Sequence, residues 1–332
     1  MIAHQFIAQG YTASCVLKAV GLSASVFYYR PSEGEKGRKR STYTLTAHGV
    51  KIDNKTVVEE ISDLLRQEFV DYGYQKVTWW LRNEKMYIIN FKKVYLLMKI
   101  NKLLYRPKIR NRSGKQWVKD LVPQPEIPFS HLEFDIKYIY IHGAKRNALL
   151  LTVIDVKSRL NMRQYLAWSI TKSRVVEVFQ YIVDHYRLPD KITVRNDNGS
   201  QFESQLVRDF LQEKHIVQEF TQPATPQQNG HIESYHSIVE RTICRQYDFD
   251  DLPHAEEVFD RFHYFYNYKR IHSGIGYRSP VRYLQSIGIS DDFNKDFYLR
   301  GWRLETTANK QAFEERKGAS APLFPLENLS LK

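Results

Sequence analysis

Cysteine and long apolar runs are both scarce in this chain of 332 residues. Its two cysteines, Cys15 and Cys244, cannot build a disulfide framework or a four-cysteine zinc site, which points to a reducing compartment. The longest near-continuous apolar stretch, residues 148–154, is far shorter than the roughly 18 residues of a membrane span. The N-terminus has neither the apolar block nor the cleavage site of a signal peptide. We therefore expect a cytoplasmic protein without a membrane partner.

Acidic residues are outnumbered by basic ones. Lys and Arg total 49 against 37 Asp and Glu, so the formal net charge is +12. A hydrophobic share of 42% is typical of a globular chain, and the length suffices for about two domains. The basic excess favours a polyanionic partner, with nucleic acid as the first candidate. A basic protein without such a partner stays open as the alternative, because net charge governs association rather than fold.

The first part of the chain is predicted to be helical, in two modules. Residues 1–31 form a short helix-turn-helix-like segment in which Gly21 breaks the apolar run. Residues 32–53 are polar and are predicted to be a linker. Residues 54–104 are predicted to form three helices, the last capped by Asn90, which fits a helix-turn-helix DNA-binding module. A small helical bundle with a solvated basic face is the alternative.

Basic residues gather on the third helix of that module and in residues 105–129, a basic, proline-rich linker. Such an arm can lie along phosphates, although a merely solvated linker explains it equally well. The candidate DNA contacts in these two segments are Lys92, Lys93, Arg106, Lys108, Arg110 and Arg112.

From residue 130 the pattern changes to alternating strands and helices, and residues 130–285 are predicted to form one α/β domain. Three consecutive strands are followed by two more that helices connect, which predicts a mixed five-stranded sheet with flanking helices. The predicted strands span residues 131–141, 148–156, 161–168, 192–195 and 216–220. Residues 286–332 form a C-terminal tail without an assigned role.

Three carboxylates stand out in this domain by their positions. Asp135 lies in the middle of the first strand, Asp197 follows the short fourth strand, and Glu233 lies on the next helix. The 35 residues between Asp197 and Glu233 carry little weight alone, because Asp291 and Glu327 have the same spacing. Context separates the two pairs, since the two strands can be neighbours and the helix can pack across them.

Carboxylates in such a group suit phosphodiester chemistry. Two divalent ions about 4 Å apart can stabilise an attacking and a leaving oxygen in line. Mg²⁺ or Mn²⁺ prefers hard oxygen ligands, so Asp and Glu suffice without His or Cys. We expect Asp135, Asp197 and Glu233 to converge on one face of the sheet and to hold these ions. Without a cation some spread is expected, because like charges repel.

Several ordered motifs resemble the OrfB-type transposases of the bacterial insertion-sequence family founded on insertion sequence three. The acidic residues lie in segments FDI, NDNGSQF and NGHIES, and a later run, YNYKRIHSGIGYRSP, resembles that family's signature after the core. Upstream, YGYQKV and KVYLLM resemble its helix-turn-helix, and VGLSASVFYYRP resembles its N-terminal motif. The likeness covers roughly residues 12–285.

The resemblance implies an RNase H-like fold with a DDE metal triad, preceded by all-α DNA-binding modules. Asp135, Asp197 and Glu233 fall on the family's three acidic positions. It implies cutting and joining of double-stranded DNA at terminal inverted repeats and at a target, by a homo-multimer associated with the bacterial nucleoid. It also implies a possible small upstream-frame DNA-binding protein, or a fusion with it. The chain has no phosphate-binding nucleotide loop, and the joining of DNA ends needs none.

One position departs from the family pattern. Seven residues after Glu233 the family usually has Lys or Arg, whereas this chain has Glu240 followed by Arg241. Either Arg241 makes the phosphate contact, or that contact is lost. This departure leaves open a decayed or domesticated DNA-binding protein that keeps the fold. An RNase H-type nuclease that cuts RNA–DNA hybrids is a further alternative.

Three other residues near the acids are expected to lie outside the chemistry. Glu133 shares a strand face with Asp135 and is expected to be a surface residue rather than a fourth acid. Asp155 is expected to fix the turn that follows the second strand. His236 is expected to be packed or solvated rather than to touch substrate.

Overall fold

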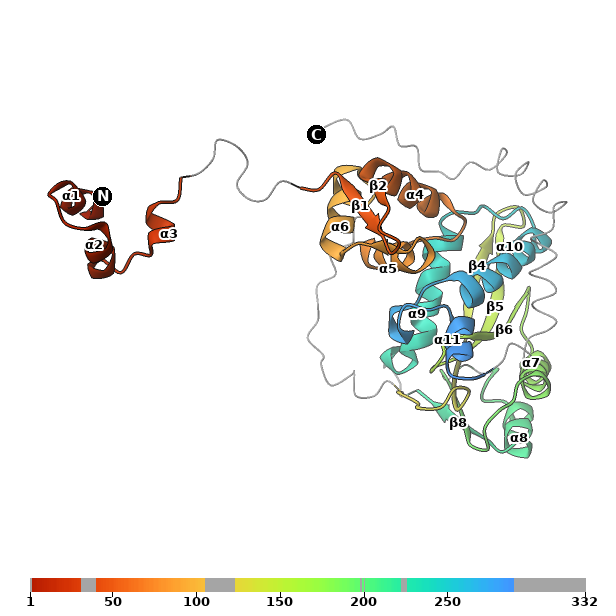
Figure 1. Cartoon of the computed structure of the whole chain (residues 1–332). Helices are drawn as coiled ribbons and strands as arrows, with labels where there is room; N and C mark the ends of the chain where they lie inside the picture. Colours follow the sequence, from red (N-terminus) through yellow and green to blue (C-terminus); the bar gives the residue numbers. More distant parts are fainter. Residues whose placement is uncertain are drawn as a thin grey trace. The chain divides into compact units, whose positions relative to one another are not determined.

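The computed structural model describes residues 2–30, 40–104, 123–197, 199, 201–221 and 226–289. The chain divides into two compact units, Met1–Thr44 and Leu45–Lys332, each described by itself (Figure 1). The tail from residue 290 and most of the predicted basic linker lie outside the described residues. So do four of the candidate DNA contacts, Arg106, Lys108, Arg110 and Arg112.

The first unit holds short helices. They are α1 (Ile2–Ala8), α2 (Ala13–Ala19) and α3 (Ala24–Phe27). The helix, turn and helix predicted from residue 12 onward are present, and Gly21 takes the left-handed conformation between them with φ of 65°. Helix α1 was not predicted. Its Ala3 packs with Val16 and Leu17 in a small core.

The helical module contains its three predicted helices and a small sheet that was not predicted. The helices are α4 (Asn54–Arg66), α5 (Tyr74–Glu84) and α6 (Phe91–Ile100), and the strands are β1 (Tyr43–Thr46), β2 (Lys51–Asp53) and β3 (Tyr87–Ile88). The sheet has the order β2-β1-β3, so residues 43–53 are not a linker and the module is not all-α. Asn90 caps α6 as predicted, because its side chain accepts from the Lys93 amide at 2.8 Å.

A mixed five-stranded sheet forms the centre of the α/β domain of residues 130–285, as predicted. Its strands are β4 (His131–Ile141), β5 (Arg146–Asp155), β6 (Asn161–Ala167), β7 (Ile192–Asn196) and β8 (Ile216–Phe220). Their order is β6-β5-β4-β7-β8, with β4, β5 and β6 antiparallel and with β7 parallel to both β4 and β8. The helices of this domain are α7 (Lys172–His185), α8 (Gln205–Glu213), α9 (Gly230–Val239), α10 (Leu252–Tyr264) and α11 (Pro280–Ser286).

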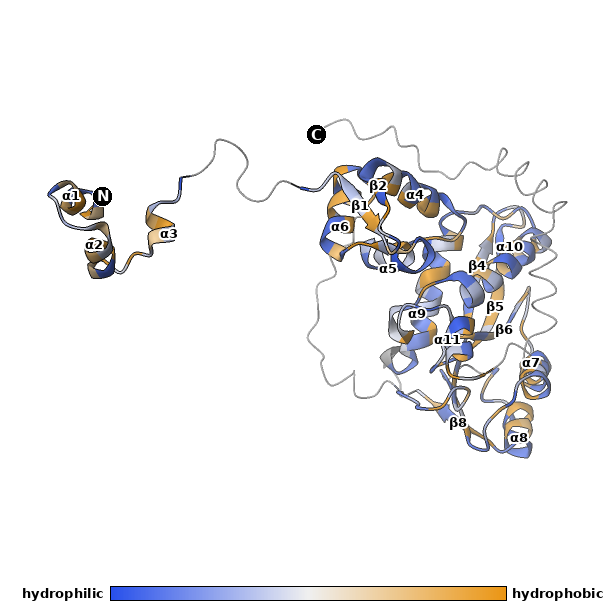
Figure 2. Ribbon diagram, viewed as in Figure 1, coloured by the Kyte–Doolittle hydropathy of each residue, from blue (hydrophilic) through white to orange (hydrophobic). Residues whose placement is uncertain are grey.

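Strand β4 supplies side chains to two separate cores, because successive residues point to opposite faces of a sheet. Leu132 and Phe134 belong to the core that includes residues of α7 and α8. Ile139 and Ile141 belong to the core that includes residues of α9 and α10. The hydrophobic segments of the central strands and of the helices are orange in Figure 2. The odd-numbered residues of β4, Asp135 among them, therefore lie on the α9 face.

Two helices of this domain end in π-helical turns. Helix α9 runs into Glu240–Cys244, and α10 runs into Phe265–Lys269. The amide of Arg245 donates to the Glu240 carbonyl, five residues back, at 3.2 Å. Because neighbouring residues on a helix point about 100° apart, Glu240 and Arg241 face different partners.

A buried ionic cluster joins the helical module to the segment after the core. Arg270, which is 1% exposed, places Nη1 2.6 Å from Asp71 Oδ1. Arg241 donates from Nε and Nη2 to Asp71 Oδ2, at 3.2 and 3.0 Å. The Tyr72 hydroxyl donates to the Lys269 carbonyl at 3.3 Å and accepts from the Ile271 amide at 2.9 Å. The signature after the core therefore has a structural role, which is to bind this module.

The pKa of Asp71 reflects this pairing. Burial by itself raises the pKa, but Arg270 and then Lys76 and Arg241 outweigh burial and bring it from 3.8 to about 2. Its stabilising effect is therefore complete above its unfolded pKa and is lost as the pH falls toward 2.

We expect Asp71→Asn to destabilise the chain by about 3–5 kcal/mol at pH 7, because it leaves Arg270 buried without a counter-charge. The difference from wild type should shrink as the pH falls from 4 toward 2, since Asp71 then protonates first in the unfolded chain and, near pH 2, in the folded chain too. Urea unfolding of the full chain measures it. Asp63→Asn, in an exposed pair with Arg66, is the matched control and should change stability by less than about 0.5 kcal/mol. Equal losses in the two variants would contradict the assignment.

Candidate active site

The three carboxylates come from three elements that meet at one end of the parallel strands. Asp135 is on β4, Asp197 directly follows β7, and Glu233 is in the first turn of α9. Strands β4 and β7 are parallel neighbours, with Glu133 paired to Arg195. Asp135 and Asp197 each lie two residues farther along, so they occupy adjacent positions. Helix α9 packs against β4 and β5, which brings Glu233 to the same end.

Asp135 feels the charges of the other two acids. Burial, the largest cause, raises the pKa of Asp135 from 3.8 to about 7, and the charges of Asp197 and Glu233 add to the rise. The Ile136 amide donates to Asp135 Oδ1 at 2.7 Å and opposes it. Partial burial also raises the pKa of Glu233. The site thus holds excess negative charge at the edge of a core.

The donor set suits a hard divalent cation. As placed, no three His, Cys, Asp or Glu side chains within the described ranges are close enough together to hold a metal ion. Mutual repulsion favours such a spread when only carboxylates face one another. A carboxylate whose pKa is raised by two neighbouring acids is nevertheless in an environment that Mg²⁺ or Mn²⁺ stabilises, and oxygen is the ligand these ions prefer.

The motif around Asp197 holds that residue in a fixed turn. The Gly199 amide donates to Asp197 Oδ1 at 3.0 Å. A Cβ at Gly199 would lie 3.0 Å from that same oxygen and 3.2 Å from the Phe202 ring, so any larger residue would have to displace one of these neighbours by a few tenths of an ångström. Phe202 is buried and packs edge-on against Phe134 of β4, with ring centroids 4.7 Å apart. The turn is therefore fixed to the strand that carries Asp135.

Glu133 is a buried residue, and the expectation of a surface position was wrong. It is 0% exposed, and its Oε2 accepts from the His231 amide at 3.0 Å and from the Ile232 amide at 2.8 Å. Burial raises its pKa to about 7, although these two bonds and the charges of Arg195 and Arg159 oppose the rise. Strand alternation correctly predicted its face, but the cover by α9 comes from the tertiary fold.

A histidine and a lysine adjoin the acids on the same face. His236 Nδ1 lies 3.5 Å from Asp135 Oδ2, and burial, with help from Lys137, lowers its pKa to about 3. His236 is therefore packed, as expected, and neutral. Lys137, two residues after Asp135, was missed, although the same alternation could have found it. Its Nζ is 3.2 Å from Glu240 Oε2.

The two residues at the departure from the family pattern have different partners. Glu240 pairs with Lys137 and, at 3.4 Å, with Arg245. Burial tends to raise the pKa of Glu240, but these two cations lower it overall. Arg241 forms an ion pair with Asp71. The guanidinium that was predicted to contact phosphate is therefore bound within the protein.

The structure also places Asp155 and the two lysines on α6. Asp155 fixes its turn as expected, because Oδ2 accepts from the Ser158 amide at 2.8 Å and Oδ1 accepts from the Phe129 amide at 2.9 Å. On α6, Lys92 is exposed and Lys93 is half-buried in the first turn, where burial lowers the pKa of Lys93.

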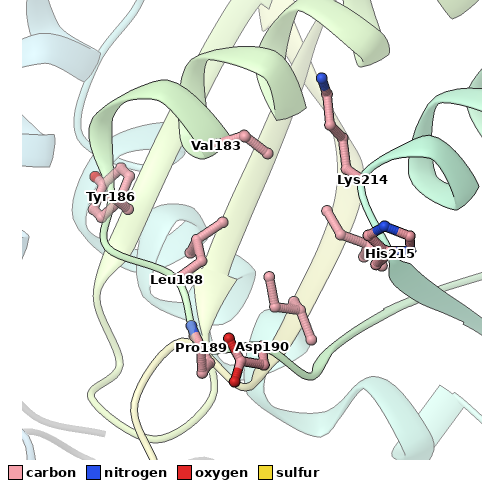
Figure 3. A pocket seen from close by; sticks show the side chains of 9 residues that line it. Val183, Tyr186, Leu188, Pro189, Asp190, Lys214 and His215 are labelled. Carbon is pink, nitrogen blue, oxygen red and sulfur yellow. The ribbon is translucent and has the colours of Figure 1, made fainter.

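A pocket lies at the other end of the parallel strands. Its lining includes Tyr186, Asp190, Ile192 and His215. Figure 3 shows the side chains that line it, with Tyr186, Asp190 and His215 among those labelled. Strand β7 begins at Ile192 in this pocket and ends next to Asp197. The carboxylate site and the pocket are thus separate features.

Comparison with known proteins identifies the domain that carries the carboxylates. Residues 125–226 match one model of the integrase core domain, and residues 214–280 match a second model with the same description. Together these spans include Asp135, Asp197 and Glu233.

Relatives with this core are mobile-element proteins. The transposase for insertion sequence element IS904 of Lactococcus lactis is 26% identical over 245 residues, covering 69% of this chain and 94% of that protein. The InsD transposase for insertion element IS2 of Escherichia coli is 27% identical over 311 residues, covering 87% and 97%. The integrase-type ORF3 protein of Spiroplasma virus SpV1-C74 is 27% identical over 120 residues, and the match spans only 31% of its length. A chain of a simian T-cell lymphotropic virus intasome aligns with a TM-score of 0.42 at 14% identity, covering 68% of this chain and 72% of that one.

The integrase core domain and the transposase relatives indicate a DDE-type polynucleotidyl transferase. The chain therefore carries an integrase core domain, and its similarity to insertion-sequence transposases confirms the resemblance seen in its motifs. No helix among the described residues is long and apolar enough to cross a membrane.

We expect Asp135→Asn to stabilise the chain in metal-free buffer at pH 8, by roughly 1 to 3 kcal/mol, because wild type must ionise a half-buried acid beside two others. Since the folded pKa is raised, the gain should vanish as the pH falls from 7 toward 4. Chemical unfolding at several pH values measures it. Asp209→Asn, exposed on α8, is the control and should give no pH-dependent gain. A gain that does not depend on pH would contradict the electrostatic assignment.

Proposed function

We propose that this transposase catalyses metal-dependent DNA strand cleavage and strand transfer at the ends of an insertion element. The observation that carries the proposal is the meeting of Asp135, Asp197 and Glu233 from β4, the end of β7 and the start of α9. The raised pKa of Asp135, with the other two acids among its causes, supports their acting as one group. The freed DNA 3′-hydroxyl would attack a second phosphodiester, so joining would need no nucleotide energy source.

Asp135, Asp197 and Glu233 are the residues that would hold one or two divalent ions. Two bound divalent ions would stabilise the negative charge on the attacking and leaving oxygens of a phosphodiester displacement. Asp135 must be ionised to serve as a ligand, and a neighbouring cation favours that form. His236, neutral and packed beside Asp135, would limit the positions that this carboxylate can take.

Glu240 does not favour a decayed copy. Its negative charge is balanced by Lys137 and Arg245, so the three residues together carry a net charge of +1. The basic side chain that the family usually has on this helix is replaced here by a lysine from β4. The face next to the acids therefore keeps a cation for a phosphate, and we favour the enzyme over the binding-protein alternative.

Binding of the element ends is assigned to the helical module. Its Lys92 and Lys93 would contact phosphates of the terminal inverted repeats, and the carboxylate site would also receive target DNA. Bridging two ends would need more than one copy of the chain. Assembly with a small upstream-frame DNA-binding protein, or fusion to it, is part of the same proposal.

Replacing Glu233 by Gln keeps its size and its helix propensity but removes one negative ligand. Cleavage and joining of a duplex with the element's own end, assayed with Mg²⁺, should fall by about two orders of magnitude or more. End binding should survive or tighten, because a charge that repels phosphate is gone. Glu213→Gln, exposed at the end of α8, should retain full activity. Wild-type activity in Glu233→Gln would exclude the catalytic assignment and leave a DNA-binding protein.

The joint variant Lys92→Ala/Lys93→Ala should weaken end binding, because it removes two charges that can displace counterions. The slope of log affinity against log salt should decrease by about 1 to 2. Lys55→Ala, exposed on α4, is the control and should leave that slope unchanged. An unchanged slope in the double variant would place the DNA-binding surface elsewhere.

A further inference from the structure

We propose that Glu133 is a positioning residue for the active site, a role that rests on the proposed function of the three acids. Its carboxylate caps the first turn of α9 from strand β4 and thereby holds Glu233 at a fixed height over Asp135. Both partners in this contact lie close in sequence to the acids. Glu133 is two residues before Asp135, and the amides it accepts belong to the two residues that precede Glu233.

Helix α9 lacks a cap of its own. The residue at its N-cap position, Asn229, makes no side-chain cap hydrogen bond. Within the described residues, Asn229 Oδ1 is buried and has no hydrogen-bond partner. The first amides of a helix need acceptors, and buried amides without them cost stability. Glu133 supplies that acceptor from another element, with one oxygen serving both the His231 and the Ile232 amide.

The position of Glu133 makes this contact rigid. On β4 it is paired with Ile154 of β5 on one side and with Arg195 of β7 on the other, so its backbone is fixed in the middle of the sheet. Its side chain is 0% exposed. A flexible surface carboxylate could not fix a helix in this way.

Two arginines support the same turn of α9. Arg159 contacts His231 Nδ1, and Arg195 Nη1 donates to the Gln228 carbonyl at 3.0 Å. The buried negative charge of Glu133 lies near both guanidinium groups and at the positive end of the α9 dipole. The start of α9 is thus held from β4, from β7 and from the turn after β5, and Glu133 is the member closest in sequence to the acids.

The test combines local amide exchange with metal binding in the full-length chain. In Glu133→Ala, hydrogen exchange in residues 229–235, measured by mass spectrometry, should accelerate at least tenfold. The dissociation constant for Mn²⁺, obtained from the rise in melting temperature with Mn²⁺ concentration, should increase by about tenfold or more. Glu133→Gln keeps one acceptor oxygen and should give smaller changes of both quantities.

Ser158→Ala is the matched control, because it removes a buried hydrogen bond to Asp155 on β5 without touching α9. It should lower the melting temperature but leave both the exchange of residues 229–235 and the Mn²⁺ affinity unchanged. If Glu133→Ala fails to fold, Glu133→Gln decides between a positioning role and a merely structural one. A lower melting temperature in Glu133→Gln, without faster local exchange and weaker Mn²⁺ binding, would overturn the proposal.

Two outcomes separate this inference from the function on which it rests. If Asp135→Asn and Glu233→Gln leave Mn²⁺ binding unchanged, the metal site itself fails, whatever Glu133 does. If those two variants lose Mn²⁺ binding and Glu133→Ala does not, the metal site stands and the positioning role fails. Loss of Mn²⁺ binding in Glu133→Ala without faster exchange would make Glu133 a direct ligand and would also overturn the positioning role.

Discussion

The alternation of side chains along β4 is the constraint on which the catalytic domain depends. One set of residues, with Leu132 and Phe134, lies in the core on the α7 and α8 side. The other set passes through Glu133, Asp135 and Lys137 and ends in the core formed with α9 and α10. A slip of one residue would move every member of both sets to the wrong face, so the apolar residues that fold the sheet also fix the acids.

Like charges are brought together at one edge of this sheet because the surroundings hold each of them in place. Asp197 is fixed by the Gly199 turn, and Glu233 is on a helix whose first amides bond to Glu133. Asp135 is partly buried, and burial together with the charges of its acidic neighbours raises the pKa of Asp135. Such a site lowers the stability of the protein without a cation, and this is the expected condition of residues that a divalent ion would bring together.

The helical module and the catalytic domain are connected by the segment after the core. Arg270, Asp71 and Arg241 form a buried ionic cluster whose loss would expose the desolvation penalty of each charge. The aromatic stack of Trp79 on Tyr277, with ring centroids 4.9 Å apart, strengthens the same contact. A signature that is distant from the three acids in sequence therefore has a plain physical role, which is to fix a DNA-binding candidate to the domain that would act on the DNA.

The sequence by itself predicted the strands and helices of the α/β domain and the three helices of the module, because strand alternation, helix periodicity and capping are local properties. The mixed sheet followed from the order of those elements, and the three acidic candidates from their positions on them together with the family resemblance. It also pointed to Asp155 as a turn residue. Only the tertiary structure decided what covers a residue. The cover of α9 made Glu133 a buried cap, the docking of the module gave Arg241 to Asp71, and pairing with β3 turned a predicted linker into strand β1. These outcomes depend on contacts between segments far apart in sequence, and no local pattern encodes them.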